Sequence, residues 1–554
     1  MHHSDPESSQ PTVLRGVLGL AILCAFLLTL GCGNDSTHFV APTPTPLATT
    51  STQIRIGDSP VDQLLAFEVT IADPVVAKLA SGQQMNVTLS NNRLELSHMA
   101  GKMEPILVSS LPQGTYNGIE ITFSDPAVTY VYQRGWFFDG SRSQIVTKDF
   151  PGSQTVKVDF NPAVTLGSKA SVVRIDMNLA KAITVNPDDS LEITGVNFTP
   201  EVFVITQTTP APADKQQHDD GELESVTGTV ASINGNSFTL NAGQSGAALT
   251  VTTTSTTQFH DSVKNLADMA NRLVEVEGYT QSDGTLVATE VEGLVGNKGA
   301  SIEGVILDAG DSMIERNVLG YAHQAQSFSM LVQDATGNGT KNDDVGWTFT
   351  VHTDYLTDTA YEVDYGKCDW KGLGTDVPGP LFPFDSRHLF PGQRVSVTTS
   401  SALPDGDFTH FTATRIELEQ QAITGQIVYY HPPKPEPTPT PSLATAPADE
   451  GTWFVLQLPE DSFVRTLSGR AFVLVYQGPA TAMECLPANE QQTIGVGTVA
   501  RVRGLMFAFA SWYPKGAPAM VSTDGGILTM IARRVIEIAP PPIIENLKPA
   551  LSHK

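Results

Sequence analysis

One residue pattern occurs three times between residues 223 and 540, and it restricts the fold of this chain more than any other feature. The first copy opens on Val226, Gly228 and Val230 and continues as strand-length runs in which apolar and polar residues alternate. This alternation puts one face of each strand inward and the other in water. Asn-Gly and Asp-Gly pairs at 234–235 and 283–284 supply the positive φ of tight hairpins. The first copy therefore predicts a small module of neighbouring antiparallel strands.

The same order of opening and closing runs returns twice. The second copy opens at residues 302–306 and closes at 416–417, and the third opens at 423–427 and closes at 535–537. Self-similarity on this scale indicates repeated domains. We therefore predict three β repeats, over residues 223–296, 300–420 and 421–540.

These three copies resemble the bacterial domain of unknown function 5666. The resemblance is clear in the first copy and looser in the other two, which carry insertions. It implies short β-barrel-like modules, arranged in tandem in secreted proteins, and it brings no catalytic residues. A Pro-rich stretch at 431–451 falls inside the third copy. We expect it to be a loop, because the strands on either side of it belong to one pattern.

Residues 52–206 follow a different pattern, in which short alternating runs are spaced as in a β-sandwich. A Pro-x-Gly turn precedes Tyr116, which can anchor the next strand by packing its ring while its hydroxyl stays hydrogen-bonded. Residues 58–62 and 111–116 resemble the domain of unknown function 4382. That resemblance implies an immunoglobulin-like module of bacterial lipoproteins, without an activity to transfer.

The predicted fold class is all-β. An N-terminal immunoglobulin-like β-sandwich is followed by three small antiparallel β-barrel-like repeats. The remaining segments lack apolar periodicity and are expected to be a tether, a linker and a tail. They cover residues 32–51, 207–222 and 541–554.

The first residues, 1–31, are typical of a lipoprotein signal peptide. Arg15 precedes an apolar run at 17–30, which has the length of a signal h-region and is too short to span a bilayer. Residues 28–32 resemble a lipobox, which implies that Cys32 is acylated, with palmitate among its chains, and becomes the mature N-terminus. In that family the following glycine implies the outer membrane or cell surface. An ordinary secretory signal with an incidental cysteine is the alternative.

Charge limits the partners of this chain. Its 554 residues carry a formal net charge of −26, which becomes −25 when the leader is removed with Arg15, Asp5 and Glu7. Such a balance disfavours nucleic acid and anionic lipid as partners through charge. Charged residues make up only 17% of the chain, which suits exposed β-sheet better than helical bundles. The length allows roughly three to five domains.

Two cysteines, Cys368 and Cys485, remain beyond the leader and the lipobox. In an oxidising compartment such a pair either forms a disulfide or stays as buried thiols. The two residues fall in different repeats, so a bond would tie the second repeat to the third. Both alternatives remain open.

Oxygen-bearing side chains occupy alternate positions of one Asn/Asp/Gly-rich stretch, as they do in calcium loops. The candidate ligands are Asp334, Thr336, Asn338 and Asp343. The twelfth position is Val345, so the bidentate acid of an EF-hand is missing, and turn geometry alone also favours this composition. Beyond the His2-His3 pair of the leader, histidines are scattered singly, and no Cys-x-x-Cys occurs, so we expect no transition-metal site and no other cofactor.

A hydrolase is the second class of function to consider. Ser59 lies in a Gly-Asp-Ser block, and Asp385 and His388 have Asp-x-x-His spacing. An ester hydrolase needs its serine on a strand-to-helix turn of an α/β fold. A proline follows Ser59 directly, no helical period follows, and the two blocks fall in different modules. We therefore expect no enzyme.

Aromatic residues gather at 130–138 and 507–513. Flat rings on a β-surface can stack on sugars or on a partner protein, although core packing is the simpler interpretation. We predict a lipid-anchored protein of the cell envelope with a structural or binding (adhesion-type) role, its ligand a glycan or an envelope protein. The alternative is a secreted hydrolase whose site is not recognisable.

Overall fold

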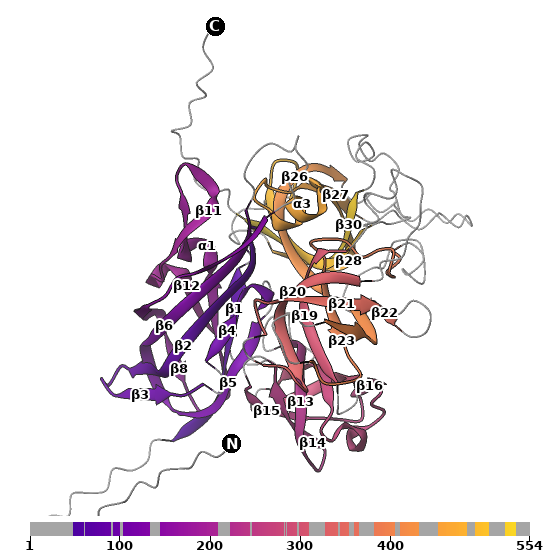
Figure 1. The fold of residues 1–554 in the computed structure, drawn as a ribbon. Helices are drawn as coiled ribbons and strands as arrows, with labels where there is room; N and C mark the ends of the chain where they lie inside the picture. Colours follow the sequence, from indigo (N-terminus) through magenta and orange to yellow (C-terminus); the bar gives the residue numbers. More distant parts are fainter. Residues whose placement is uncertain are drawn as a thin grey trace, which may run out of the picture. The chain divides into compact units, whose positions relative to one another are not determined.

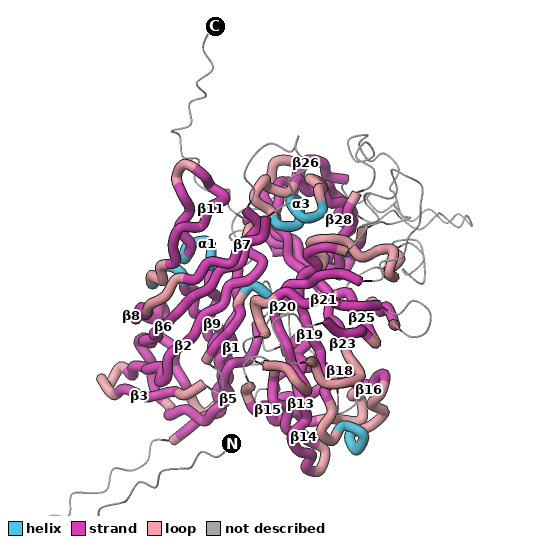
Figure 2. Tube along the Cα trace, in the orientation of Figure 1, coloured by secondary structure: helices cyan, strands magenta, loops and turns pink. Residues whose placement is uncertain are grey.

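The computed structural model describes the chain in the following ranges: 48–59, 61–89, 92–99, 103–132, 144–208, 222–243, 246–281, 283, 285–295, 299–309, 327–341, 344–353, 359–364, 382–404, 410–431, 452–484, 494–508 and 527–538. The chain divides into two units, Met1–Leu47 and Ala48–Lys554, and every described residue belongs to the second. Regular structure in this unit is almost entirely strand (Figures 1 and 2), which confirms the predicted all-β fold. Among the described residues, no helix is long and apolar enough to cross a bilayer.

Two sheets form the N-terminal module. One has the strand order β12-β9-β1-β5, and the other β3-β2-β6-β7 with β4 paired to β2 and β8 paired to β6. Side chains of both sheets share one hydrophobic core, so the sheets pack face to face as a sandwich. The strand bounds are β1 Thr49–Ser59, β2 Leu64–Leu79, β3 Gln84–Val87, β4 Arg93–Glu95, β5 Met103–Pro112, β6 Gly114–Tyr132, β7 Gln144–Asp149, β8 Ser153–Leu166, β9 Ser171–Asn178 and β12 Phe203–Thr208.

Short elements complete this module. A hairpin of β10 (Ile183–Asn186) and β11 (Asp189–Val196) follows the one-turn helix α1 (Leu179–Ala182). Strand β1 already begins at Thr49, which pairs with Pro112 of β5, so the first strand starts inside the range expected for the tether.

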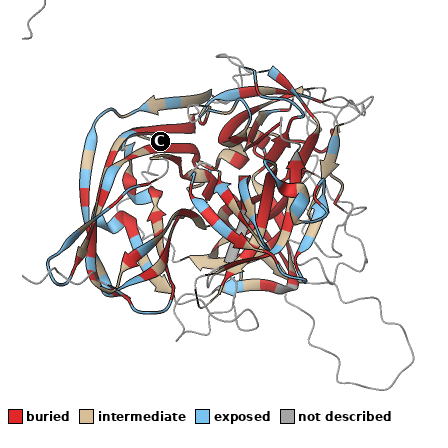
Figure 3. Cartoon of the chain, turned by 90° about the horizontal axis from the view of Figure 1, so that it is seen from below, coloured by how far each residue is buried: buried red, intermediate tan, exposed pale blue. Residues whose placement is uncertain are grey.

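Alternation along β1 divides its side chains between two environments. Ile54 and Ile56 point toward the sandwich core. Arg55 points the opposite way and is only 2% exposed, and its Nη2 donates to Gln53 Oε1 at 2.9 Å and to Thr280 Oγ1 of the first repeat at 3.1 Å. Both faces of this strand are therefore covered, in keeping with the many buried residues seen along the strands in Figure 3.

Tyr116 has the anchoring role expected from the sequence. Its side chain is 3% exposed, and its hydroxyl donates to the carbonyl oxygen of Pro112 at 2.9 Å. Gly114 allows the turn between them, with a φ of 155°. The predicted strand start is thus confirmed together with its hydrogen bond.

Five strand positions recur in each repeat. In the first repeat they are occupied by β13 (Glu222–Asn234), β14 (Ser237–Ala242), β15 (Ala248–Thr252), β17 (Leu273–Thr280) and β18 (Leu286–Val295), with β16 (Gln258–Asp261) continuing the third position. In the second repeat they are β19 (Ala300–Asp308), β20 (Ser327–Gly337), β21 (Thr348–Thr353) with β22 (Ala360–Glu362), β23 (Arg394–Thr398), and a broken fifth strand of β24 (His410–Ala413) and β25 (Arg415–Leu418). In the third they are β26 (Gln420–His431), β27 (Thr452–Gln457), β28 (Phe472–Glu484), β29 (Val499–Phe507) and β30 (Leu528–Ile538).

The pairing in each repeat follows one order, in which the first strand lies between the second and fourth and the fifth lies between the third and fourth. A ring of five strands cannot alternate in direction throughout, so one pair must be parallel. That pair joins the third and fifth positions in all three copies: β15 with β18, β21 with β24, and β28 with β30. The fully antiparallel arrangement expected from the sequence is wrong at this pair. The connectivity is that of the five-stranded Greek-key barrels of the oligonucleotide- and oligosaccharide-binding (OB) type.

The opening glycine of each repeat lies against a neighbouring strand. A Cβ at Gly304 would stand 2.0 Å from Leu331 O on β20. A Cβ at Gly228 would stand 2.4 Å from Asn241 O, and a Cβ at Gly425 would stand 2.7 Å from Gln457 O. All three contacts are shorter than a side chain tolerates, so this position of the motif requires glycine.

The strands that flank the Pro-rich stretch pair with each other. His431 at the end of β26 lies opposite Trp453 near the start of β27. Residues 432–451 therefore connect two neighbouring strands of one barrel, whose ring is closed by β29 and β30.

Candidate binding face

The first three strands of the first repeat carry six outward side chains that are short, polar and uncharged. The apolar side chains on the same strands, such as Phe238 and Leu240, alternate with them and fill the barrel core. The outward residues are half-buried or exposed: Ser232, Ser237, Thr239, Asn241, Thr250 and Thr252. We refer to these six residues as the hydroxyl face.

Cross-strand hydrogen bonds order the hydroxyl face. Ser232 Oγ donates to Thr239 Oγ1 at 3.2 Å, and the hydroxyls of Ser237 and Thr252 lie 2.9 Å apart. Thr239 stands directly opposite Thr250 on the next strand. None of the six side chains ionises at neutral pH, so the face is uncharged although the chain is acidic. Each hydroxyl can both donate and accept a hydrogen bond.

Two of the predicted calcium ligands lie in a strand. Asp334 and Thr336 lie within β20 and are 8% and 9% exposed. Asn338 follows in the turn, is exposed, and donates its N–H to Gly299 O at 3.0 Å. Asp343 is outside the described residues. The calcium assignment stays a prediction, and its first two residues belong to a strand that continues to Gly337.

Several predicted sites fall outside the described residues. They are the lipid-attachment residue and the two cysteines of the proposed bond, namely Cys32, Cys368 and Cys485. Acylation and disulfide formation therefore stay predictions.

The two hydrolase blocks lie in different modules, the first at the end of a strand and the second in a segment between strands. Ser59 is the last residue of β1, and the next described element is another strand, β2. Asp385 and His388 do meet, with Asp385 Oδ1 2.8 Å from His388 Nδ1, in the segment before β23. Burial would raise the pKa of Asp385, but hydrogen bonds from His388 and Arg387 outweigh it and hold the pKa well below its usual range. Because the Arg387 N–H also donates to Asp385, at 2.7 Å, this carboxylate closes a local turn.

The described members of the two aromatic stretches pack inside the protein. Tyr130 is 2% exposed and lies edge-on to Tyr132 with a ring-centroid distance of 6.4 Å. Phe507 is 1% exposed, and its ring centroid lies 5.3 Å from that of Phe382. Core packing therefore accounts for these residues, and the others lie outside the described ranges.

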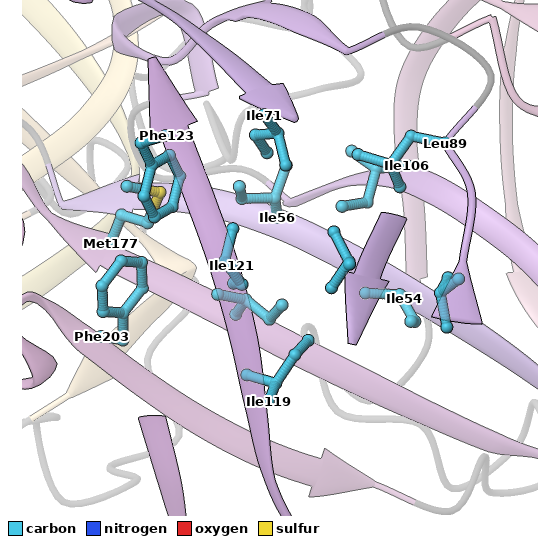
Figure 4. A pocket seen from close by; sticks show the side chains of 13 residues that line it. Ile54, Ile56, Ile71, Leu89, Ile106, Ile119, Ile121, Phe123, Met177 and Phe203 are labelled. Atoms are coloured by element: carbon cyan, nitrogen blue, oxygen red, sulfur yellow. The ribbon is translucent and has the colours of Figure 1, made fainter. Parts of the chain in front are cut away.

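An apolar cavity lies inside the sandwich core (Figure 4). Its volume is about 20 Å³, and side chains such as Ile56, Ile71 and Phe123 point into it. Pockets for small-molecule ligands enclose about 300–1,000 Å³. This cavity is therefore a packing gap in the core.

Two buried ionic arrangements gave no signal in the sequence. His98 is fully buried, with Nδ1 3.0 Å from Glu95 Oε2 and Nε2 2.9 Å from Glu104 Oε1. Its carbonyl oxygen accepts from Arg394 Nη2 of the second repeat at 2.5 Å. Because Arg394 is far away in the sequence, no local spacing could reveal the contact.

The second arrangement centres on Arg415 of β25. Its Nη1 lies 2.8 Å from Asp261 Oδ2, and its Nη2 lies 2.8 Å from Glu417 Oε2. Glu292 and Glu362 also pair with this guanidinium. Asp261 and Glu292 belong to the first repeat, so Arg415 links that repeat to the second.

Comparison with known proteins supports the family resemblance of the first repeat. Residues 227–292, which include the whole hydroxyl face, match a domain of unknown function (DUF5666). No curated protein matches the chain. A solved structure of Drosophila Unr CSD456 shares 10% identity with it, over 58% of this chain and 99% of that one, with a TM-score of 0.11. A TM-score this low adds nothing to the fold assignment, and the resemblance of the N-terminal module to family 4382 stays a prediction.

Proposed function

We propose that this protein is a lipid-anchored binding protein of the cell envelope, with an adhesion-type role, and that the hydroxyl face binds a neutral oligosaccharide. The observation that carries the proposal is an uncharged, hydroxyl-lined surface on the first three strands of a five-stranded barrel. OB barrels bind oligonucleotides and oligosaccharides on this side, around their second and third strands. The likeness of topology is an analogy, because a fold alone does not set function.

Charge selects between those two ligand classes. The chain has a formal net charge of −26, which repels a polyanion such as a nucleic acid. A neutral sugar meets no such barrier. Its hydroxyls donate and accept as the Ser, Thr and Asn side chains of the face do.

A glycan-binding assay tests the ligand. The full chain, purified in detergent, is applied to an array of neutral and acidic glycans. Thr239→Val and Thr250→Val together remove two facing hydroxyls while keeping the side-chain shape, and we expect at least a tenfold loss of binding to neutral glycans. Thr122→Val is the matched control, because Thr122 forms a similar 2.8 Å pair with Thr155 on the N-terminal module. Absence of glycan binding by the unaltered chain, or equal binding by all variants, would refute this ligand.

The same preparations separate binding from hydrolysis. Incubation with ester and glycan substrates should yield no product, and Ser59→Ala should leave the result unchanged. Turnover that disappears in Ser59→Ala would establish the hydrolase instead.

Membrane attachment is tested on Cys32. Diacylation adds two chains at roughly 0.8 kcal/mol per buried methylene, enough for stable anchoring. Cys32→Ser should therefore move the protein to the soluble fraction or leave the leader uncleaved. Cys24→Ser, inside the apolar run of the leader, is the control and should still sediment with membranes. A cleaved Cys32→Ser protein that stays with the membrane would rule out the lipid anchor.

A further inference from the structure

Two histidines of the second repeat lie side by side on the outer surface of its barrel. His352 belongs to β21 and His410 to β24, and both residues are exposed. The residues next to them, Val351 and Phe411, belong to the barrel core, so alternation points the histidines outward. Their rings are nearly parallel, with an interplanar angle of 19° and centroids 5.6 Å apart. Because 58 positions separate the two residues in the sequence, no local spacing indicated the pair.

The ring nitrogens of this pair have the spacing of two ligands on one metal ion. His410 Nδ1 lies 3.4 Å from His352 Nε2. Hydrogen bonds from N–H groups to oxygen are usually about 2.7–3.2 Å long, so a direct bond between the rings is weak at the observed distance. Zinc binds imidazole nitrogen at about 2.0–2.1 Å, and two such ligands at a tetrahedral angle stand about 3.3–3.4 Å apart. The pair can therefore bind a zinc ion without a change in the distance between the two nitrogens.

The neighbouring side chains leave the pair open to a cation. Thr350 lies opposite His410, and Ser327 and Thr412 lie opposite His352 on the two adjacent strands. None of these three side chains is charged, so none repels a cation. Their hydroxyls can accept hydrogen bonds from water bound to an ion.

Strand register identifies the equivalent positions in the other two repeats. In each repeat a valine of the third strand lies opposite an apolar residue of the fifth, and the two positions follow that valine and precede its partner. The equivalent pairs are Thr252 with Thr285 and Tyr476 with Thr529. The barrel thus forms without histidine at these positions, and the imidazole pair is particular to the second repeat.

The pair spans the point where the second barrel closes. The fifth strand of this repeat is broken, and its first part, β24, has only four residues. The continuous fifth strands of the other repeats, β18 and β30, have 10 and 11 residues. In the described sheet, β24 lies at the end of the strand order, next to β21. A link between His352 and His410 would therefore fasten a short edge strand to its neighbour.

We propose that His352 and His410 bind one zinc ion, which links β21 to β24 and secures the closure of the second barrel. Imidazole is a common ligand of zinc, copper and nickel. Adjacent ligands of a square-planar ion stand about 2.8–3.0 Å apart, so the observed spacing of 3.4 Å fits tetrahedral zinc better than square-planar copper or nickel. Water completes the coordination, so the site holds its ion less tightly than a structural site with four protein ligands. This proposal replaces the expectation that the chain has no transition-metal site, and it does not depend on the sugar-binding function.

Zinc binding to the full chain tests the site. The protein is purified in detergent, stripped with a chelator and titrated with zinc chloride, while mass spectrometry follows amide exchange in β21 and β24. Because a bound ion stabilises the state that binds it, zinc should slow exchange in β24 at least fivefold. Magnesium, which prefers oxygen ligands, should have no such effect. Exchange in β24 that zinc leaves unchanged would overturn the proposal.

His352→Gln and His410→Gln test the ligands. Each change removes one imidazole from an exposed position, so we expect the fold to be kept. Each variant should bind one zinc ion fewer than the parent chain and lose the effect of zinc on exchange in β24. His260→Gln is the matched control, because it removes a surface histidine of the first repeat, whose Nε2 lies 3.2 Å from Glu290 Oε1. This control should respond to zinc as the parent chain does.

Two results would place the ion elsewhere. One is slowed exchange in β24 that persists in both His352→Gln and His410→Gln, and the other is an equal loss of the effect in His260→Gln. If a variant does not fold, modification of the unaltered chain with diethyl pyrocarbonate gives a second readout. Zinc should protect His352 and His410 from this reagent but not His260, and equal modification of all three with and without zinc would also overturn the proposal.

Discussion

At the scale of single residues, Asp62 connects the N-terminal module to the third repeat. Its Oδ1 accepts from the N–H of Thr424 at 2.8 Å, and its carbonyl oxygen accepts from the N–H of Phe463 at 2.7 Å. Burial raises the pKa of Asp62 from 3.8 to about 7, against the opposing hydrogen bonds from Thr424 and the charge of Arg501. This carboxyl therefore changes its charge near neutral pH.

Raising the pH should weaken the contact that Asp62 makes with the third repeat. The pKa of Asp62 is about 7 in the folded protein and 3.8 ordinarily. The contribution of its carboxyl group to the stability of the fold is therefore fully present below pH 3.8 and is lost as the pH rises through 7. We expect amide exchange around Thr424 to accelerate between pH 5 and pH 8 beyond its intrinsic pH dependence. Asp62→Asn should remove most of that excess. Burial also raises the pKa of Glu68, to about 6, so Glu68 lowers stability with rising pH as Asp62 does. That part of the pH dependence should remain in Asp62→Asn. An undiminished excess in Asp62→Asn would contradict the assignment.

Residue roles could be predicted from the sequence where the partner is local. Tyr116 lies four positions from Pro112, so the turn between them already indicated the hydrogen bond. Asp62 and His98 make contacts with residues more than 290 positions away. Such pairs depend on how the modules meet, and no spacing along the chain encodes that.

At the scale of strands, the opening glycines explain why the repeat motif is recognisable. In the second repeat the register between β19 and β20 shifts at Gly304, where the carbonyl of Leu331 approaches most closely. A β-bulge of this kind sharpens the bend of a strand that closes a small barrel. The glycine is thus a requirement of barrel curvature.

Gly304→Ala should destabilise the second repeat by about 1–3 kcal/mol, the usual range for overpacking a tight site. The added methyl would meet Leu331 O at 2.0 Å, so the two strands must separate. Gly167→Ala is the control, because no atom lies within 4 Å of the place its methyl group would take, and it should be nearly neutral. Thermal unfolding, monitored by circular dichroism, compares the two variants with the parent chain. Equal melting temperatures would show that small shifts relieve the contact between the added methyl group and Leu331 O.

Strand pattern was more predictable than strand direction and length. Alternation located the strands of the first repeat, and the hairpin at Asn234-Gly235 is present, with a φ of 62° at Gly235. Strands β2 and β6, of 16 and 19 residues, are longer than the short alternating runs expected from the sequence, because register shifts interrupt their alternation. The parallel pairs were missed, since they follow from ring closure and leave no mark on local sequence.

At the scale of the whole molecule, Arg415 is the main ionic link between the first two repeats. It is 8% exposed and pairs with carboxylates from both, including Asp261 and Glu417. Removing one partner from a buried ionic group leaves the other charges uncompensated, which typically costs about 3–5 kcal/mol. The sequence predicted the number of repeats but contained no sign of this link.

Arg415→Gln should therefore lower the melting temperature strongly and raise amide exchange in both repeats. Arg387→Gln serves as the control, because Arg387 forms a more exposed pair with Asp385 at 2.6 Å and its loss should change stability little. If both variants have the melting temperature of the parent chain, the ion pairs of Arg415 contribute no net stability.

The first repeat should also fold when it is separated from the rest. Residues 222–295 contain all six strands of their sheet and a hydrophobic core of their own. We expect the fragment to give a β-type circular dichroism spectrum and slow amide exchange in β13 and β17. An unfolded or aggregating fragment would show that contacts such as Thr280 with Arg55 are needed for folding.

The position of the fifth strand in each ring determines when a barrel can be completed during synthesis. A chain that emerges from a ribosome or a translocon with its N-terminus first delivers four strands as an open sheet, with unpaired edges at the third and fourth positions. Only the last segment, such as Leu286–Val295 in the first repeat, fits between those edges and closes the ring. Until it arrives, each module exposes two templates for pairing with a neighbouring copy. Slow emergence of these closing segments would thus favour strand exchange between adjacent repeats.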